Sequence, residues 1–502
     1  MDTPSSPSSP SRVSGCRIQT LCLEGSEVRP VEIELQFTGG LMQRIVLTGL
    51  PGGAVREARD RIRGCLERLG LPVPRRSVLV NFAPADLPKS GNGFDLPLVL
   101  GLLVLGGTLS AESLRERVVF GELALDGRLR PVHGALRLAL DARERGLRRV
   151  LLPAANAAEA ALVDGLIVEG AETLTQALGI LSGDAPAPID TLTEAPMPRA
   201  DLRDVRGQAS GRRALEVAAT GRHNLLLCGP PGTGKTMLAT RLPSLLPALT
   251  EEQVLEVTAL HGLLPHHTPR LQRHPPFRAP HHTVSRAGLV GGGRPLVPGE
   301  LSLAHRGVLF LDEIAEFPRS LLEALRQPLE EHAVNVARVG GSARFAADLQ
   351  LVGAMNPCPC GDWGHPRRGC RCTPTQIERY RRKLSAPLRD RFDLHVDLPV
   401  PDAHQLLDEL PAEDSASVAA RVGAARAVLD SAPPANLPAA LKPRLERAIT
   451  AFSLSGRAVA RVCAVARSLA ALDQRVELVA EDLDEALFFR RGLIEWTQPC
   501  GT

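Results

Sequence analysis

The sequence predicts an α/β protein with a parallel sheet in its middle part and helices at its C-terminal end. Three short apolar runs, each bounded by glycine, proline or acidic residues, are typical of strands buried on both faces. They lie within residues 223–229, 307–313 and 349–357. A glycine-rich segment follows the first run and leads into a helical pattern. Beyond residue 402 the strands disappear, and Ala- and Leu-rich amphipathic helices replace them.

Composition is typical of a soluble chain with several cores. The 502 residues are 44% hydrophobic, and a prior of roughly 150 residues per domain suggests about three domains. The formal charge is only +3, so any nucleic-acid partner has to be argued from local clustering. No charged-then-apolar leader is present and most cysteines are scattered, which favours a reducing cytoplasm over a secreted disulfide framework.

Five segments are expected along the chain. They are a disordered Ser/Pro-rich tail (1–15), an α/β domain (16–182), a Pro- and Ala-rich linker (183–200), a second α/β segment with a cysteine knuckle at 358–372 (201–401), and a helical lid (402–502).

The first α/β domain mixes short strands with helices. Strand-like runs lie at 44–49, 77–82, 117–125 and 148–153, and helical patterns at 54–70 and 134–146. The apolar run 96–109 is shorter than the roughly 20 residues that a membrane crossing needs, so a buried core helix is expected there and no membrane partner.

A nucleotide-binding motif follows the first apolar run of the second segment. The sequence "GPPGTGKT" fits G-x-x-x-x-G-K-[ST] between a strand and a helix, the order that a P-loop requires. Its residues are Gly229, Pro230, Pro231, Gly232, Thr233, Gly234, Lys235 and Thr236. The loop amides and Lys235 are expected to hold the phosphates of ATP, and Thr236 is expected to ligate Mg²⁺.

Acidic and amide side chains end the next two strands. Asp312 is expected to hold the Mg²⁺ shell and Glu313 to orient and deprotonate the attacking water. Asn356 is expected to sense the γ-phosphate. Two acids that merely cap a strand, and an asparagine that merely forms a turn, are the alternatives at these positions.

Four cysteines follow Asn356 as C-x-C, nine residues, C-x-C. They are Cys358, Cys360, Cys370 and Cys372, and four thiolates can surround one structural Zn²⁺. C-x-C is tighter than the usual spacing, so free thiols and redox pairing stay open, and His365 is an alternative ligand. The position next to Asn356 suggests a knuckle that stiffens the sensor loop.

Two further clusters lie in the second α/β segment, one overlapping the knuckle and one well before it. Residues 367–391 hold nine Arg/Lys, two acids and Tyr380, which would suit a polyanionic backbone or form a solvated helix face. Six of the thirteen histidines lie between His261 and His282, but no spacing there fits a second metal site well.

Several ordered motifs carry a family resemblance. They include "VNFAPADLPKSGNGFDLP" (80–97), "FRAPHHTVSRAGLVGGG" (277–293), "NPCPCG" and "APLRDRFDLHV" (386–396). From about residue 17 to residue 490 the chain resembles the ComM/YifB group of magnesium-chelatase-like AAA+ ATPases. The resemblance implies a homo-hexameric ring, with the segment around residues 261–295 as an insert facing the pore.

The same resemblance assigns two arginines. Arg391 matches the arginine finger that reaches the γ-phosphate of the neighbouring subunit, although Arg389 stands where the family usually has an apolar residue. Arg457 matches the sensor-2 arginine, with Arg461 the nearby alternative. Without the family, these would be read as helix-surface charges.

The N-terminal domain resembles that of Lon-type proteases, the ribosomal S5 domain 2-like fold, through residues 121–153. Proteolysis there needs a serine nucleophile and a lysine base. The serine loop reads "GNGFDLP" and the lysine position is Arg137, which cannot act as a base. We therefore expect no peptidase activity, with the neighbours Lys89 and Ser90 as the one remaining candidate dyad.

Together these features favour an ATP-driven hexameric DNA motor, as the resemblance implies for branch migration in natural transformation. Its expected partners are single-stranded or branched DNA and recombinase or competence proteins. A magnesium-chelatase-type ATPase subunit and a protein remodeller or transcription activator are the alternatives.

Overall fold

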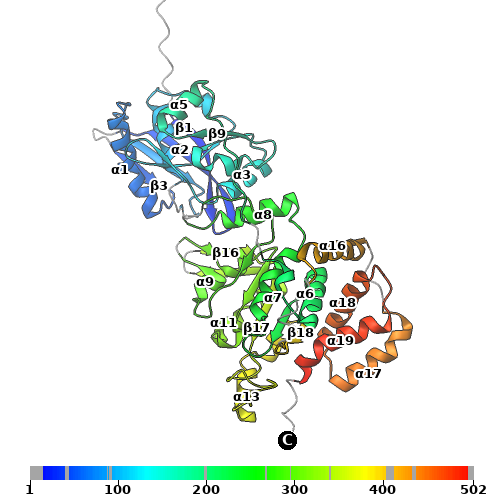
Figure 1. The fold of residues 1–502 in the computed structure, drawn as a ribbon. Helices are drawn as coiled ribbons and strands as arrows, with labels where there is room; N and C mark the ends of the chain where they lie inside the picture. The colour runs from blue at the N-terminus through cyan, green and yellow to red at the C-terminus, as the bar shows by residue number, and fades with distance from the viewer. Residues whose placement is uncertain are drawn as a thin grey trace, which may run out of the picture.

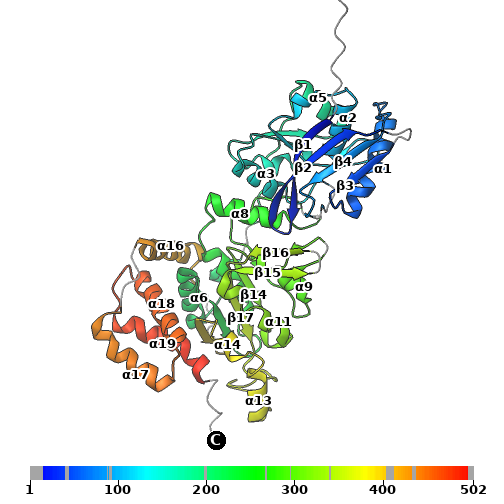
Figure 2. The same ribbon diagram turned by 180° about the vertical axis from the view of Figure 1, so that it is seen from behind.

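The computed structural model describes residues 15–39, 44–87, 89, 93–196, 200–265, 268–293, 295–338, 341–402, 412–431 and 437–495. Three bodies follow one another: an N-terminal domain, a core built on a parallel sheet, and a group of C-terminal helices beside the core (Figure 1; Figure 2). The expected tail lies almost entirely outside the described residues.

In its described residues, the N-terminal domain combines two main sheets with five α-helices. One sheet has the order β1-β2-β4-β3 and the other the order β5-β8-β9. The strands are β1 (Gly15–Glu24), β2 (Glu27–Phe37), β3 (Ile45–Thr48), β4 (Val78–Ala83), β5 (Arg117–Val119), β6 (Glu122–Leu123), β7 (Leu129–Arg130), β8 (Arg149–Pro153) and β9 (Ile167–Ala171). The helices are α1 (Gly53–Arg68), α2 (Asp95–Leu105), α3 (Ala135–Glu144), α4 (Ala154–Ala160) and α5 (Leu174–Ser182).

Helix α2 is the core of this domain. Every residue from Asp95 to Leu105 is buried, and a Cβ added at Gly101 would meet the side chains of Leu35 and Ile18 on β2 and β1. A helix this apolar is stable only when it is surrounded by protein. None of the helices in the described part of the chain combines the length and apolar character that a bilayer crossing requires.

The run 117–125 forms two strands instead of one. Strand β5 pairs with β8, whereas β6 pairs with β7. Gly121 lies between the two strands; its N–H donates to the carbonyl of Gly93, and a Cβ added there would lie 3.2 Å from Leu96 and from Pro153. Glycine suits this close approach because it has no side chain to accommodate.

The core is a five-stranded parallel sheet with the order β11-β14-β17-β10-β18. The three runs read as buried strands form β10 (Leu225–Cys228), β14 (Val308–Leu311) and β17 (Gln350–Met355), and β11 (Phe277–Arg278) and β18 (Leu394–Asp397) lie at the edges. Two hairpins are added, β12 (Gly291–Gly292) with β13 (Val297–Pro298) and β15 (Ala333–Arg338) with β16 (Gly341–Ala346). The helices are α6 (Ala209–Gly221), α7 (Lys235–Arg241), α8 (Glu251–His261), α9 (Arg286–Val290), α10 (Glu300–Leu303), α11 (Arg319–Ala324), α12 (Pro328–Glu331), α13 (Pro374–Arg381) and α14 (Ala386–Arg389).

The C-terminal helices pack against α6 and the edge strand β18 (Figure 1). They are α16 (Ser415–Ser431), α17 (Lys442–Phe452), α18 (Gly456–Leu472) and α19 (Ala480–Glu495). Near the end of α19, buried Arg490 donates to the carbonyl of Phe392 at 3.2 Å. This hydrogen bond attaches the helices to the segment that leads into β18.

The N-terminal domain contacts the core directly. The N–H of Gly134, before α3, donates to the carbonyl of Gly262 after α8 at 2.9 Å. Ser26, between β1 and β2, donates to the carbonyl of Arg344 on β16. The expected linker is irregular but tied to the core, since the N–H of Ala195 donates to the carbonyl of Leu271 at 2.9 Å.

A buried carboxyl group lies at this contact between domains. Glu159 on α4 is buried, with its carboxylate beside Gly262. Burial raises the pKa of the Glu159 carboxyl to about 7, and the backbone N–H of Leu136 offsets this only partly. The folded protein therefore keeps a proton on Glu159 at pH values where the unfolded chain has released it.

Stability should accordingly fall as pH rises through the interval between the ordinary pKa and about 7. We expect Glu159→Gln to match the wild type near pH 4, below the ordinary pKa, and to be more stable at pH 8, by up to roughly 3 kcal/mol. Melting temperatures at both pH values would measure this, with the exposed Glu144→Gln as control. Equal melting temperatures of Glu159→Gln and the wild type at pH 8 would contradict it.

Candidate nucleotide site and cysteine cluster

The glycine-rich loop Gly229–Thr236 joins β10 to α7. Gly232 and Gly234 have φ values of +82° and +87°, a region that glycine enters without strain. The hydroxyl of buried Thr233 donates to the carbonyl of Pro230 at 3.0 Å and closes the turn. Backbone amides are thereby gathered ahead of the first turn of α7, as an anion-binding loop requires.

Lys235 folds back over this loop. Its ammonium donates to the carbonyls of Gly229 at 2.6 Å and Pro230 at 2.9 Å, and to the Asn356 amide oxygen at 3.1 Å. Burial holds the pKa of the Lys235 ammonium below its ordinary value, partly offset by the nearby Cys228, Asp312 and Glu313. A phosphate group would offer the same ammonium a charged partner in place of three neutral oxygens.

The two acids expected for metal and water lie at the same edge of the sheet. The hydroxyl of Thr236 donates to Asp312 Oδ2 at 2.8 Å, so the two expected Mg²⁺ ligands are in direct contact. The Glu313 N–H donates to Asp312 Oδ1 at 2.9 Å, and Glu313 has a φ of +49° with an exposed side chain. A hydroxyl and a carboxylate oxygen suit Mg²⁺, which prefers oxygen ligands.

An open pocket of about 320 Å³ lies beside these residues. Its lining includes Thr236, Asp312 and Glu313, together with His281 and His282 from the segment after β11. The sequence singled out the histidine run without connecting it to the nucleotide site. The pairing of β11 with β14, at Phe277 with Val308 and Arg278 with Leu309, brings these histidines to the pocket, and the two-residue strand β11 has no periodic pattern by which the sequence could reveal it.

The described histidines of that run do not gather as metal ligands. His261 is buried, with Nε2 3.0 Å from the carbonyl oxygen of Leu303. The rings of His281 and His282 lie against each other with centroids 4.0 Å apart and planes tilted by 35°. His266 and His267 lie outside the described residues.

The two assigned arginines share one carboxylate partner and lie away from the phosphate loop of their own chain. Arg391 Nη2 and Arg457 Nη2 each lie 2.6 Å from Glu330 Oε1. Arg461, the alternative to Arg457, pairs with Asp393 and donates to the carbonyl of Arg391. Neither Arg391 nor Arg457 lines the pocket beside Asp312.

Strand direction explains this separation. The loop follows the carboxyl end of β10, whereas Arg391 precedes the amino end of β18, which is parallel to β10. Asn224, at the amino end of β10, donates to the carbonyl of Arg391 at 2.8 Å. Arg391 is therefore held at the edge of the sheet opposite the phosphate loop. Arg389, the alternative to Arg391, is half-buried in the same turn, and burial lowers the pKa of its guanidinium.

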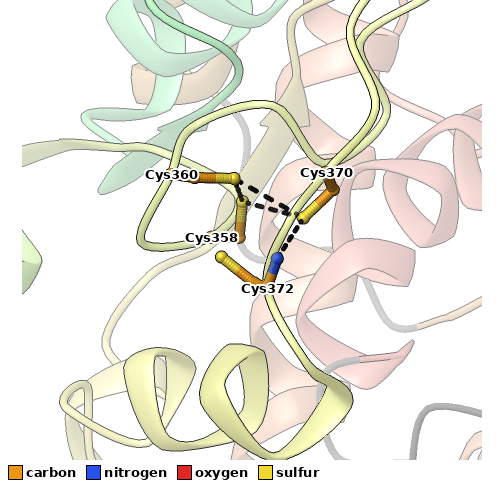
Figure 3. Close-up of side chains that lie close together, drawn as sticks. All are labelled: Cys358, Cys360, Cys370 and Cys372. Atoms are coloured by element: carbon orange, nitrogen blue, oxygen red, sulfur yellow. Dashed lines mark hydrogen bonds between the residues drawn. The ribbon is translucent and has the colours of Figure 1, made fainter.

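The four cysteines of the knuckle come together. Figure 3 shows Cys358 and Cys360 on one limb of the loop pointing toward Cys370 and Cys372 on the other. The Sγ of Cys358 lies 3.4 Å from that of Cys360 and 3.6 Å from that of Cys370. These separations exceed a disulfide bond and approach the roughly 3.8 Å between thiolates around one Zn²⁺.

Burial raises the pKa of the Cys358, Cys370 and Cys372 thiols, whereas backbone N–H groups in this cluster act in the opposite direction and favour ionised sulfur. Trp363 and Cys372 donate to the sulfurs of Cys358 and Cys370, each at 3.4 Å. N–H groups of Asp362 and Arg371 lower the pKa of the Cys360 thiol to about 6. The donor set therefore fits a structural Zn²⁺, which four thiolates would hold. His365 instead accepts from the N–H groups of Arg367 and Arg368.

The knuckle packs against the phosphate loop. A Cβ added at Gly361 would lie 2.8 Å from Pro231 Cδ, and φ is +84° there, so only glycine fits this approach easily. Asn356 begins the same segment and contacts Lys235. A metal that fixes the knuckle would therefore also fix one wall of the loop.

The candidate dyad of the N-terminal domain falls partly outside the described residues, because Ser90 is not among them. Lys89 is buried, and its ammonium donates to the carbonyl of Pro84. Burial lowers the pKa of this ammonium. The lysine is thus held by a backbone oxygen of its own loop.

These features define a P-loop ATPase of the AAA+ class. The glycine loop follows a central strand of a five-stranded parallel sheet, an acidic pair follows a second strand, and the C-terminal helices lie alongside.

Comparison with known proteins gives the family. Residues 201–406 match the model for magnesium chelatase, subunit ChlI; residues 33–156 match the model for subunit ChlI of Mg-chelatase; and residues 430–490 match the ChlI C-terminal model. The chain is 40% identical over 494 residues to YifB of Escherichia coli, covering 94% of this chain and 96% of that protein. It is 38% identical to competence protein ComM of Haemophilus influenzae, covering 93% and 95%.

A shorter similarity, 30% identity over 172 residues, is to the peroxisomal Lon protease homolog 2 of Caenorhabditis elegans, covering 32% of this chain and 22% of that protein. The chain belongs to the magnesium chelatase subunit ChlI family of AAA+ ATPases, with YifB and ComM as relatives along nearly its whole length. The predicted family and fold class are thereby confirmed.

The cysteine cluster leads to a test of metal binding. We expect the purified protein to carry about one Zn²⁺ per chain and Cys370→Ser to carry much less, because three thiolates hold the ion less tightly than four. Elemental analysis after gel filtration would measure both. Cys463→Ser, a cysteine on α18 outside the cluster, is the control. Zinc content that is unchanged in Cys370→Ser would contradict a four-thiolate site.

Proposed function

We propose that this protein is an ATP-hydrolysing hexameric motor that acts on single-stranded or branched DNA, with ComM-like branch migration as its activity. The observation that carries the proposal is the division of the catalytic residues between two edges of one sheet. The phosphate loop, Asp312 and Glu313 lie at the carboxyl ends of the parallel strands, while Arg391 lies at their amino ends. Such a division suits a ring in which each protomer completes the site of its neighbour.

Each side chain then has a role in hydrolysis. Lys235 leaves the loop carbonyls and binds the β- and γ-phosphates. Thr236 and Asp312 would hold Mg²⁺, which neutralises charge on the phosphates. Glu313 orients the attacking water and takes its proton. Once Lys235 has turned to the phosphates, the amide of Asn356 is free to sense the γ-phosphate. Arg391 and Arg457 stabilise the charge that develops on the γ-phosphate of a neighbouring protomer.

The cysteine knuckle supplies a surface suited to nucleic acid. Trp363 is 43% exposed, and the neighbouring Arg367, Arg368 and Arg371 are exposed too. Arg368 lies 4.0 Å from Asp362, and no ion pair involves Arg367 or Arg371 within the residues described. An aromatic face among exposed arginines can stack a base and hold the adjoining phosphates. The knuckle and α13 lie at the end of the core away from the N-terminal domain (Figure 2).

ATP hydrolysis is tested by two substitutions in the site. Lys235→Ala should abolish nucleotide binding, because the ammonium that faces the phosphates is then absent. Glu313→Gln should bind ATP but hydrolyse it roughly 10²–10⁴-fold more slowly. Steady-state ATPase and nucleotide-binding measurements would separate these effects. The exposed Lys442→Ala is the control, and full ATPase activity in Glu313→Gln would contradict the assignment.

DNA binding is tested on the knuckle. We expect Arg367→Ala with Arg371→Ala to weaken binding to single-stranded and four-way-junction DNA, and to reduce the slope of the salt dependence by about one for each arginine that pairs with a phosphate. Fluorescence anisotropy across a salt series would measure it. Arg75→Ala with Arg148→Ala, two exposed arginines of the N-terminal domain, is the matched control. The proposal is wrong if DNA neither binds nor stimulates the wild-type ATPase.

A second candidate, the ATPase subunit of a tetrapyrrole metal-insertion enzyme, draws on the match to the chelatase family models. Chelation assays with a porphyrin and partner chelatase subunits would distinguish it. Metal insertion that depends on Lys235 would favour this function over a DNA motor.

A further inference from the structure

One carboxylate oxygen binds both assigned arginines. Glu330, in α12, places its Oε1 2.6 Å from Arg391 Nη2 and 2.6 Å from Arg457 Nη2. The three residues come from separate parts of the chain: Arg391 precedes β18 in the core, and Arg457 lies in the first turn of α18. Glu330 therefore joins the core to the C-terminal helices through the two groups that the ring is proposed to use.

The cluster around Glu330 has an excess of positive charge. One carboxylate faces two guanidinium groups, and Arg461 and Arg326 lie close enough to lower the pKa of Arg391 further. Burial is the largest contribution to that lowering, and Glu330 is the group that opposes it. Arg461 is separately paired with Asp393. A more highly charged anion than one carboxylate would be a better partner for Arg391 and Arg457.

Exposure shows how such an anion would reach them. The Arg391 side chain is only 3% exposed, whereas those of Glu330 and Arg457 are 44% and 50% exposed. Glu330 and Arg457 thus form the accessible side of the cluster, with Arg391 beneath them. An incoming phosphate group would meet Arg457 first and would have to displace the carboxylate of Glu330 to bind Arg391.

We propose that Glu330 is the resting partner of Arg391 and Arg457, occupying the place that the γ-phosphate of ATP on a second copy of this chain takes when protomers associate. The inference rests on the proposed ring ATPase. In the separate protomer the carboxylate keeps both guanidinium groups paired and Arg391 buried. Association exchanges this ion pair for a pair with phosphate, so Glu330 opposes association until a neighbour brings ATP.

The test is the protein concentration at which ATPase activity per protomer is half-maximal. Glu330→Gln keeps the shape of the side chain and removes its charge, so the competing ion pair is weakened. We expect this half-maximal concentration to fall by about three- to tenfold. Glu331→Gln is the matched control, because Glu331 is the next residue of the same helix and accepts hydrogen bonds from Gln327 and Asn335. The half-maximal protein concentration of Glu331→Gln should equal that of the wild type.

A combined variant separates this role from a structural one. The background Arg391→Ala with Arg457→Ala lacks the proposed catalytic arginines, so association there is followed by sedimentation velocity with ATP bound and not by ATPase activity. In that background Glu330→Gln should no longer change the protein concentration at half-maximal association, because the ion pairs are already absent. Melting temperatures would verify that each variant folds. The inference would be overturned if the wild-type activity depends on protein concentration and the half-maximal concentration of Glu330→Gln equals or exceeds that of the wild type. Wild-type activity per protomer that is independent of concentration would instead overturn the proposed ring.

Discussion

The central constraint of this structure is the position of β10 between β17 and β18 in a parallel sheet. Because the strands run in one direction, the loop after β10, Asp312 after β14 and Asn356 after β17 all emerge at one edge. Crevices at the carboxyl ends of parallel strands are common ligand sites for this reason. The contacts of Lys235 with Asn356 and of Thr236 with Asp312 follow from that arrangement.

The same direction of the strands leaves Arg391 at the other edge, anchored by Asn224 at the start of β10. In the proposed ring, an arginine so placed would act on the nucleotide of a neighbouring protomer. The contacts of Glu330 then give the isolated chain a defined state in which this group is paired and buried. In the proposed ring, formation of the assembly, release of Arg391 and binding of nucleotide would share one set of ion pairs, and ATP between two protomers would supply the charge that exchanges them.

The cysteine knuckle connects the nucleotide site to a surface. Its first cysteine lies two residues after Asn356, and Gly361 approaches the phosphate loop at Pro231. Its exposed side carries Trp363 and arginines. A loop of this length has few apolar residues to hold it in place, so a structural metal is a physically reasonable source of its rigidity. Movement of Asn356 with the γ-phosphate would be transmitted to the surface over a few rigid residues.

The sequence alone determined the local elements. Strand runs with buried character, the glycine loop, the four-cysteine spacing and the amphipathic C-terminal helices are set by residue type and periodicity over short distances, and family motifs supplied the expected roles of Arg391 and Arg457. Tertiary structure alone decided that these arginines share Glu330, that His281 and His282 line the pocket beside Asp312, and that residues 117–125 divide at Gly121. Such contacts join segments far apart in the chain and depend on how strands and helices pack, which no local pattern encodes.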